Sequence, residues 1–113
     1  MNFSCSVCDN IYDFPKVPIW LCDCGKPLVV HYNWENKVKS IDIIENELSL
    51  WRYKSVLPDI QTIISLGEGH TPLIPISNNV YVKDETLNPT GSFKDRGMAL
   101  AVTMAKAQGV KTI

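Results

Sequence analysis

The first 24 residues of this 113-residue chain hold all four of its cysteines. They form two close pairs, Cys5-x-x-Cys8 and Cys22-x-Cys24, with thirteen residues between the pairs. Two pairs at that separation can fold together, and four thiolates suit a tetrahedral metal, most often Zn²⁺. The C-x-C pair is tighter than the usual C-x-x-C knuckle, but Gly25 permits a sharp turn directly after it. Because four ligands fill the coordination shell, the pattern favours a structural metal over a catalytic one.

The state of these cysteines depends on the cellular compartment. Residues 1–10 contain no Lys or Arg followed by an apolar stretch, so they do not resemble a secretory signal, and we expect a cytoplasmic protein. Disulfides are rare in that compartment. A bound metal, with zinc first, is therefore our main hypothesis for Cys5, Cys8, Cys22 and Cys24. Two disulfides and four metal-free thiols are the alternatives.

Composition excludes two classes of partner. The chain has 11 basic and 12 acidic residues, and they are balanced in both halves, which argues against nucleic-acid binding. The longest apolar run, Met98–Val102, is far shorter than the about 20 residues that span a bilayer, so we expect no membrane partner. A chain of this length can bury roughly two-thirds of its unfolded surface in one core.

The chain divides into three segments. Residues 1–32 hold short apolar pieces between prolines and Gly25, which predict a small β module with strands at Ile11–Tyr12, Ile19–Leu21 and Leu28–Val30. Residues 33–58 predict a linker and then a short helix over Trp51–Leu57 that ends before Pro58. Residues 59–113 alternate strand-like and helical patterns. The expected fold class is α/β.

The last segment has the clearest secondary-structure signals. Strands are predicted over Thr71–Ile76 and Val80–Lys83, joined by a turn at Ser77–Asn79, and a further strand is predicted to begin at Val110–Ile113. A helix is predicted over Phe93–Gln108, because its interior is rich in Ala, Met and Leu and its apolar residues surround most of the axis.

The ends of that helix are also marked in the sequence. Ser92 can cap its start together with Asp95 three residues later, and Gly109 supplies a left-handed stop. Phe93 is expected to pack beneath the helix.

Lys94 stands in the first turn of this helix, where the helix dipole disfavours a positive charge. A lysine that reacts as a neutral amine benefits from that position, although the dipole contributes only about 0.3–1 kcal/mol. Without other information Lys94 is either a surface lysine or a reactive amine. We expect Arg96, on a different face, to be a structural ion-pair partner.

Two other features have simpler interpretations. The two glycines of Gly67–Gly69 suit a structural turn better than a phosphate cradle, since the signal for an anion site is weak there. His31 and His70 have no partner visible in the sequence, so we expect neither to be catalytic.

Two stretches closely resemble a known family. They are Gly67-Glu68-Gly69-His70-Thr71-Pro72-Leu73, and the run from Val82-Lys83-Asp84-Glu85 through Asn88-Pro89-Thr90-Gly91-Ser92-Phe93-Lys94-Asp95-Arg96-Gly97. Both resemble the threonine synthases, which are fold-type II enzymes that use pyridoxal phosphate. The resemblance implies that Lys94 is the catalytic residue and binds pyridoxal 5'-phosphate covalently. It also implies the conversion of O-phosphohomoserine and water to threonine and phosphate. Asp95, between Lys94 and Arg96, favours a synthase over the related dehydratases.

The resemblance also implies parts that these 113 residues do not contain. The six glycines are scattered, so no cluster of adjacent glycines can wrap the cofactor phosphate. We therefore expect residues 59–113 to be an incomplete small domain of such an enzyme, inactive without further chain, and a homodimer if full length. The alternatives are a truncated, non-catalytic remnant with a structural metal site, or a related enzyme such as cysteate synthase.

Overall fold

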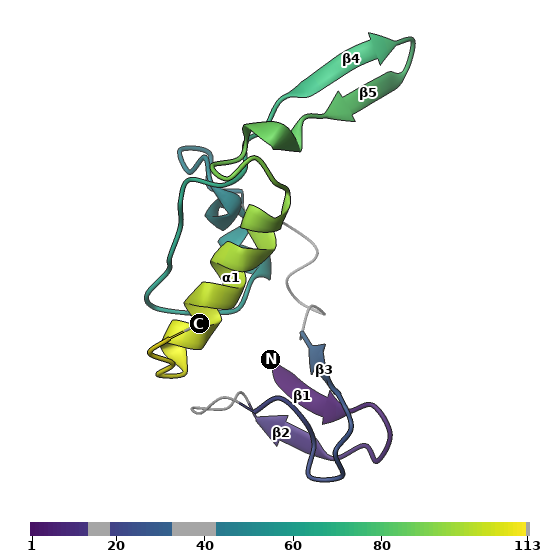
Figure 1. The fold of residues 1–113 in the computed structure, drawn as a ribbon, viewed down its shortest axis with the longest axis vertical. Helices are drawn as coiled ribbons and strands as arrows, with labels where there is room; N and C mark the ends of the chain where they lie inside the picture. Colours follow the sequence, from purple (N-terminus) through teal and green to yellow (C-terminus); the bar gives the residue numbers. More distant parts are fainter. Residues whose placement is uncertain (14–18, 33–42, 113) are drawn as a thin grey trace.

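The computed structural model describes residues 1–13, 19–32 and 43–112 of the chain (Figure 1). Within them it contains two antiparallel sheets, two short 3₁₀ helices and one α-helix. The chain is thus a small mixed α/β structure, in agreement with the expected class. Most of the predicted linker, residues 33–42, lies outside the described residues. None of the helices in the described part of the chain is long and apolar enough to cross a membrane.

The amino-terminal sheet has three short strands, β1 (Asn2–Cys5), β2 (Ile11–Asp13) and β3 (Leu28–His31), in the order β2-β1-β3. Both neighbours pair with β1 in the antiparallel direction. The sequence patterns predicted β2 and β3 but not β1. The predicted strand piece around Trp20 is wrong, since only an isolated bridge between Leu21 and Pro27 forms there.

The short helix before Pro58 is a 3₁₀ helix, η1 (Leu50–Val56). Its first turn is capped by Ser49, whose hydroxyl accepts from the backbone N–H of Trp51. The Trp51 side chain is only 1% exposed, and its indole N–H donates to the carbonyl of Ile64 at 3.2 Å. This tryptophan therefore ties η1 to the segment that leads toward the second sheet.

The second sheet is a hairpin of β4 (Leu73–Ser77) and β5 (Val80–Lys83). Strand β5 has the predicted bounds, whereas β4 begins two residues and ends one residue later than predicted. Its turn includes Asn79 at a φ of 61°, a left-handed conformation that asparagine tolerates well. Every residue of both strands is exposed, and Figure 1 shows the hairpin projecting from the start of the α-helix. A second 3₁₀ turn, η2 (Glu85–Leu87), follows it.

The α-helix α1 (Lys94–Ala107) lies within one residue of the prediction and ends where Gly109 adopts a φ of 79°. Thr103, fully buried, joins α1 to the extended segment beside it, because its hydroxyl oxygen accepts from the backbone N–H of Ile64 at 2.8 Å. Two expectations are wrong. Phe93 is 65% exposed rather than packed beneath the helix. The strand expected from Val110 does not form over the described residues, since no neighbouring strand pairs with them there.

Candidate functional site

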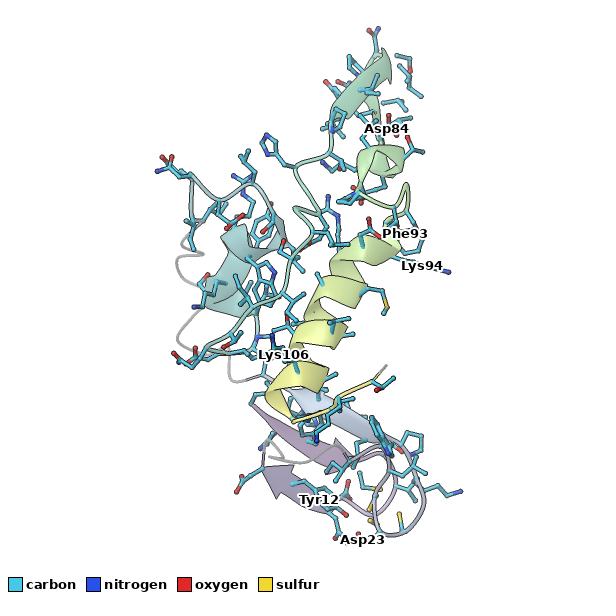
Figure 2. The ribbon with its side chains drawn as sticks, turned by 60° about the vertical axis from the view of Figure 1, so that its left-hand side comes forward. Tyr12, Asp23, Asp84, Phe93, Lys94 and Lys106 are labelled. Carbon is cyan, nitrogen blue, oxygen red and sulfur yellow. The ribbon has the colours of Figure 1, made fainter. Side chains whose placement is uncertain are left out.

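Lys94 is the first residue of α1, and its side chain is exposed. Its backbone N–H donates to the Ser92 hydroxyl at 3.2 Å, so this serine does satisfy one free donor of the first turn. Figure 2 shows the side chains of Phe93 and Lys94 projecting from the helix start on the side away from η1. The lysine amine is therefore presented outward from a fixed point of the backbone.

Asp95 does not complete the capping box with Ser92 that the sequence suggested. Its side chain is buried and accepts instead from the loop before the helix, from the backbone N–H of Thr90 at 2.8 Å and from the Thr90 hydroxyl. The carboxylate thus folds the loop Asn88–Phe93 back onto the helix start. A negative charge in the first turn also complements the helix dipole.

Arg96 forms an ion pair with Glu85 of η2, as expected for a structural partner. The guanidinium contacts both carboxylate oxygens, with Nε to Oε2 at 2.8 Å and the second contact at 2.9 Å. The Thr71 hydroxyl adds a bond to the same carboxylate at 2.6 Å. The Arg96 guanidinium lowers the pKa of the Glu85 carboxyl to about 2, and Glu85 in turn raises the pKa of Arg96.

Asn88 extends this network to the glycine turn. Its amide donates to Glu85 Oε2 at 2.8 Å and its oxygen accepts from the backbone N–H of Gly69 at 2.9 Å. Glu68, inside the turn, is fully buried and accepts from the Ser65 hydroxyl at 2.8 Å. The Gly67–Gly69 segment is thus a structural turn, and the two stretches that carry the family resemblance meet around Glu85 and Arg96.

Both histidines have polar partners that the sequence did not reveal. His31 lies 2.7 Å from the Ser4 hydroxyl across the amino-terminal sheet. His70, at a φ of 48°, places Nδ1 3.3 Å from the guanidinium of Arg52.

The four cysteines converge in the amino-terminal module. All four sulfur atoms lie within 4.8 Å of one another, and the Cys5–Cys24 and Cys8–Cys22 sulfur pairs are each 3.5 Å apart. A tetrahedral zinc with bonds of about 2.3 Å places its sulfurs roughly 3.8 Å apart, which is close to this spacing. All four thiols are free of disulfides. The donor set and its geometry therefore fit one metal ion.

Hydrogen bonds distinguish the four sulfurs electrostatically. The backbone N–H groups of Val7 and Cys8 both point at Cys5 Sγ at 3.4 Å, and these bonds lower the pKa of Cys5. The Tyr12 hydroxyl, 3.1 Å from Cys22 Sγ, lowers the pKa of Cys22 to about 6. Contact with the Cys5 and Cys22 sulfurs raises the pKa of the Cys24 thiol to about 12. The module thus already favours some thiolates over others.

Comparison with known proteins gives the class of the segment that contains Lys94. Residues 64–113 match the family of pyridoxal-phosphate dependent enzymes. The matched range begins just before the glycine turn and contains Lys94 together with the Glu85–Arg96 pair. Residues 64–113 thus belong to this family of pyridoxal-phosphate dependent enzymes.

Within that family its relatives are threonine synthases. The chain is 40% identical to the threonine synthase of Methanocaldococcus jannaschii over 122 aligned residues, covering 96% of this chain and 30% of the relative. It is 32% identical to that of Methanosarcina acetivorans, covering 99% of this chain and 30% of the relative. It is 49% identical to that of Halalkalibacterium halodurans over 80 residues, covering 58% of this chain and 23% of the relative.

The chain therefore spans less than a third of the length of these relatives. No solved structure matches it. The two archaeal alignments cover nearly the whole chain, so the likeness extends through the amino-terminal cysteine module as well as the Lys94 region.

Proposed function

We propose that this chain supplies the Lys94-bearing part of a pyridoxal-phosphate dependent threonine synthase, which converts O-phosphohomoserine and water to threonine and phosphate. The observation that carries the proposal is the position of Lys94, held at the start of α1 with its amine directed outward. It lies within the part of the chain that matches the enzyme family. Cysteate synthase chemistry is the alternative within the same class.

The residues around Lys94 fit covalent attachment of the cofactor. Lys94 would hold pyridoxal phosphate through its amine and, when released, move protons at the substrate carbons. The cofactor supplies an electron sink for carbanionic charge. Asp95 bonds to Thr90 and Arg96 bonds to Glu85, so the backbone at Lys94 is tied to the segment that precedes it.

A chimera tests this proposal. We would replace the aligned segment of the M. jannaschii threonine synthase with this chain and measure threonine release from O-phosphohomoserine. The chimera should form threonine, and Lys94→Ala should abolish both activity and the adduct left on the protein after borohydride reduction. Lys106→Ala, at the other end of α1, is the matched control and should keep both. Retention of the adduct in Lys94→Ala would refute the role of Lys94.

The 113 residues on their own provide a second measurement. We expect no threonine release from the isolated chain, because the cluster of adjacent glycines that would cradle the cofactor phosphate is absent from its sequence. Borohydride reduction after incubation with pyridoxal phosphate should still mark Lys94 more than Lys106. Equal marking would mean that nothing in the chain selects Lys94.

We further propose that Cys5, Cys8, Cys22 and Cys24 hold a structural zinc ion. The observation that favours it is the convergence of the four sulfurs. Zinc would link the turn after β1 to the turn before β3, and with four sulfur ligands it would leave no position for substrate. Metal analysis of anaerobically purified protein should find about one zinc per chain, and Cys22→Ser should lose it. Much less than one equivalent of zinc in the unaltered protein would refute the site.

The remaining proposals concern organisation and setting. We propose a four-cysteine module over residues 1–32, a linker with a short helix over 33–58, and a partial catalytic domain over 59–113. Limited proteolysis should cut first within 33–58. We also propose a cytoplasmic protein that acts on a small molecule and pairs as a homodimer in the complete enzyme.

A further inference from the structure

Tyr12 contacts the cysteine cluster from the side. It belongs to β2, and its hydroxyl oxygen lies 3.1 Å from Cys22 Sγ. The same oxygen lies 3.1 Å from the backbone nitrogen of Asp23, the residue between the two cysteines of the second pair. Figure 2 shows Tyr12 and Asp23 at the same end of the module, beside the sulfur atoms. One hydroxyl thus contacts both a ligand atom and the backbone that joins two ligands.

The direction of these hydrogen bonds follows from the groups involved. The Asp23 backbone N–H can only donate, so the Tyr12 oxygen accepts from it. A cysteine that binds a metal is a thiolate, and a thiolate can only accept. The Tyr12 hydroxyl must then donate its hydrogen to Cys22. The result is a chain of two bonds, from Asp23 N–H to Tyr12 and from Tyr12 O–H to the sulfur.

Tyr12 also links the two cysteine pairs through the sheet. Its partner across the ladder is Phe3 of β1, and β1 ends at Cys5, the first ligand. Cys5 and Cys22 are the two buried cysteines, at 2% and 3% exposure. Tyr12 therefore lies on the strand paired with the one that ends at Cys5, while its hydroxyl contacts Cys22.

We propose that Tyr12 is a positioning residue of the metal centre, which orients Cys22 by hydrogen bonding its sulfur and thereby strengthens zinc binding. This inference rests on the proposed zinc site. Groups that hydrogen bond to metal ligands typically change metal affinity by about 10–100-fold when they are removed. The phenol ring already fills its place in the module, so the hydroxyl alone can be tested.

The test compares zinc affinity in Tyr12→Phe and in the unaltered chain by competition with a chromogenic chelator. Tyr12→Phe should bind zinc about 10–100-fold more weakly. Tyr81→Phe, the same change on the exposed strand β5, should leave the affinity unchanged. Asp23→Ala keeps the backbone N–H and should also leave it nearly unchanged, which separates the hydrogen bond from the nearby charge.

Two spectroscopic and chemical readouts distinguish positioning from a general loss of stability. With Co²⁺ in place of zinc, Tyr12→Phe should shift the sulfur-to-cobalt charge-transfer band, because one sulfur loses a hydrogen bond. Iodoacetamide should also modify Cys22 faster in the zinc-loaded variant. An unaltered chain that binds no zinc would refute the zinc site itself. Normal zinc binding with the same affinity, cobalt band and alkylation rate in Tyr12→Phe would overturn the role of Tyr12 alone.

Discussion

The two residues that follow Lys94 are both held by polar contacts. Asp95 accepts from Thr90 in the preceding loop, and Arg96 reaches Glu85 in η2. Lys94 itself is exposed and lies two residues before Arg96, whose charge is balanced by Glu85. The two basic residues at the start of α1 thus differ in their surroundings, because Arg96 is ion-paired whereas Lys94 is exposed, as its proposed role requires.

The Glu85–Arg96 pair makes a pH-dependent contribution to stability. The pKa of Glu85 is about 2 in the folded chain, against an ordinary value of 4.5. Between these values an unfolded chain binds a proton that the folded chain does not, so the stabilisation is complete above pH 4.5 and is lost as the pH falls toward 2. Glu85→Gln should lower the thermal midpoint at pH 6, and the difference from the unaltered chain should vanish near pH 2.

Circular dichroism melts at a series of pH values measure this difference. Other carboxylates titrate in both proteins and cancel in the comparison. Asp59→Asn, which alters an exposed carboxylate, should give no such difference. A Glu85→Gln difference that is the same at pH 6 and pH 2 would contradict the ion-pair explanation.

The two glycines that flank the buried Glu68 should differ in their tolerance of a side chain. Both have positive φ, but a Cβ on Gly69 would lie 3.1 Å from the backbone nitrogen of Leu50, whereas a Cβ on Gly67 would meet nothing within 4 Å. Gly67→Ala should cost about 1–2 kcal/mol from backbone strain alone. Gly69→Ala should cost more, because the neighbouring backbone must also move. Urea unfolding of the two variants makes the comparison, and equal costs would show that crowding at Gly69 is unimportant.

At the scale of elements, the Thr103 hydroxyl joins the carboxyl-terminal half of α1 to the extended segment at Ile64. Thr103 accepts from the Ile64 N–H at 2.8 Å and donates to the Ile64 carbonyl at 3.3 Å. The Ile64 carbonyl also accepts from the indole N–H of Trp51. Thr103→Val would therefore leave mainly the Ile64 N–H without a hydrogen-bond partner. We expect a loss of about 1–3 kcal/mol in the free energy of unfolding. Thr103→Ser keeps the hydroxyl and should lose less, and the reverse order would contradict this account.

Local sequence patterns predicted the elements that depend on local chemistry. Ala-rich composition and Gly109 identified α1, and two strand-like runs joined by the turn residues Ser77–Asn79 identified the hairpin. Where structure depends on distant partners, the patterns failed. A strand at Val110 needs a neighbour that the described residues do not supply, and Asp95 bonded to Thr90 rather than to Ser92 because the loop folds back onto it.

The same distinction holds for the candidate sites. The cysteine spacing and the position of Lys94 are readable because they lie within short motifs. Glu85 and Tyr12 were missed as contributors, since their partners lie eleven and ten residues away in segments of different structure. Glu85 could have been found, because it is an acidic residue in the same family motif as Arg96, for which an ion-pair partner was expected. For Tyr12, a tyrosine between two cysteine pairs carries no such signal.

At the scale of the whole molecule, much apolar surface faces solvent. Both strands of the hairpin are exposed along their length, and large apolar side chains such as Ile76 and Val82 are exposed by 62% and 44%. Leu87 and Phe93, between the hairpin and α1, are each 65% exposed. Covering one such side chain is worth about 1.5–3 kcal/mol, so this end of the molecule favours association.

We therefore expect the isolated chain to bind a hydrophobic dye and to self-associate as its concentration rises, with the hairpin as the contact. Ile76→Lys should reduce both effects, because it places a charge where apolar surface would be buried. Asn78→Lys adds the same charge in the turn of the hairpin without removing apolar surface, and it should reduce them much less. Dye fluorescence and sedimentation velocity measure the two effects. If both variants reduced association equally, general charge repulsion would be the cause; if neither did, the contact would lie elsewhere than the hairpin.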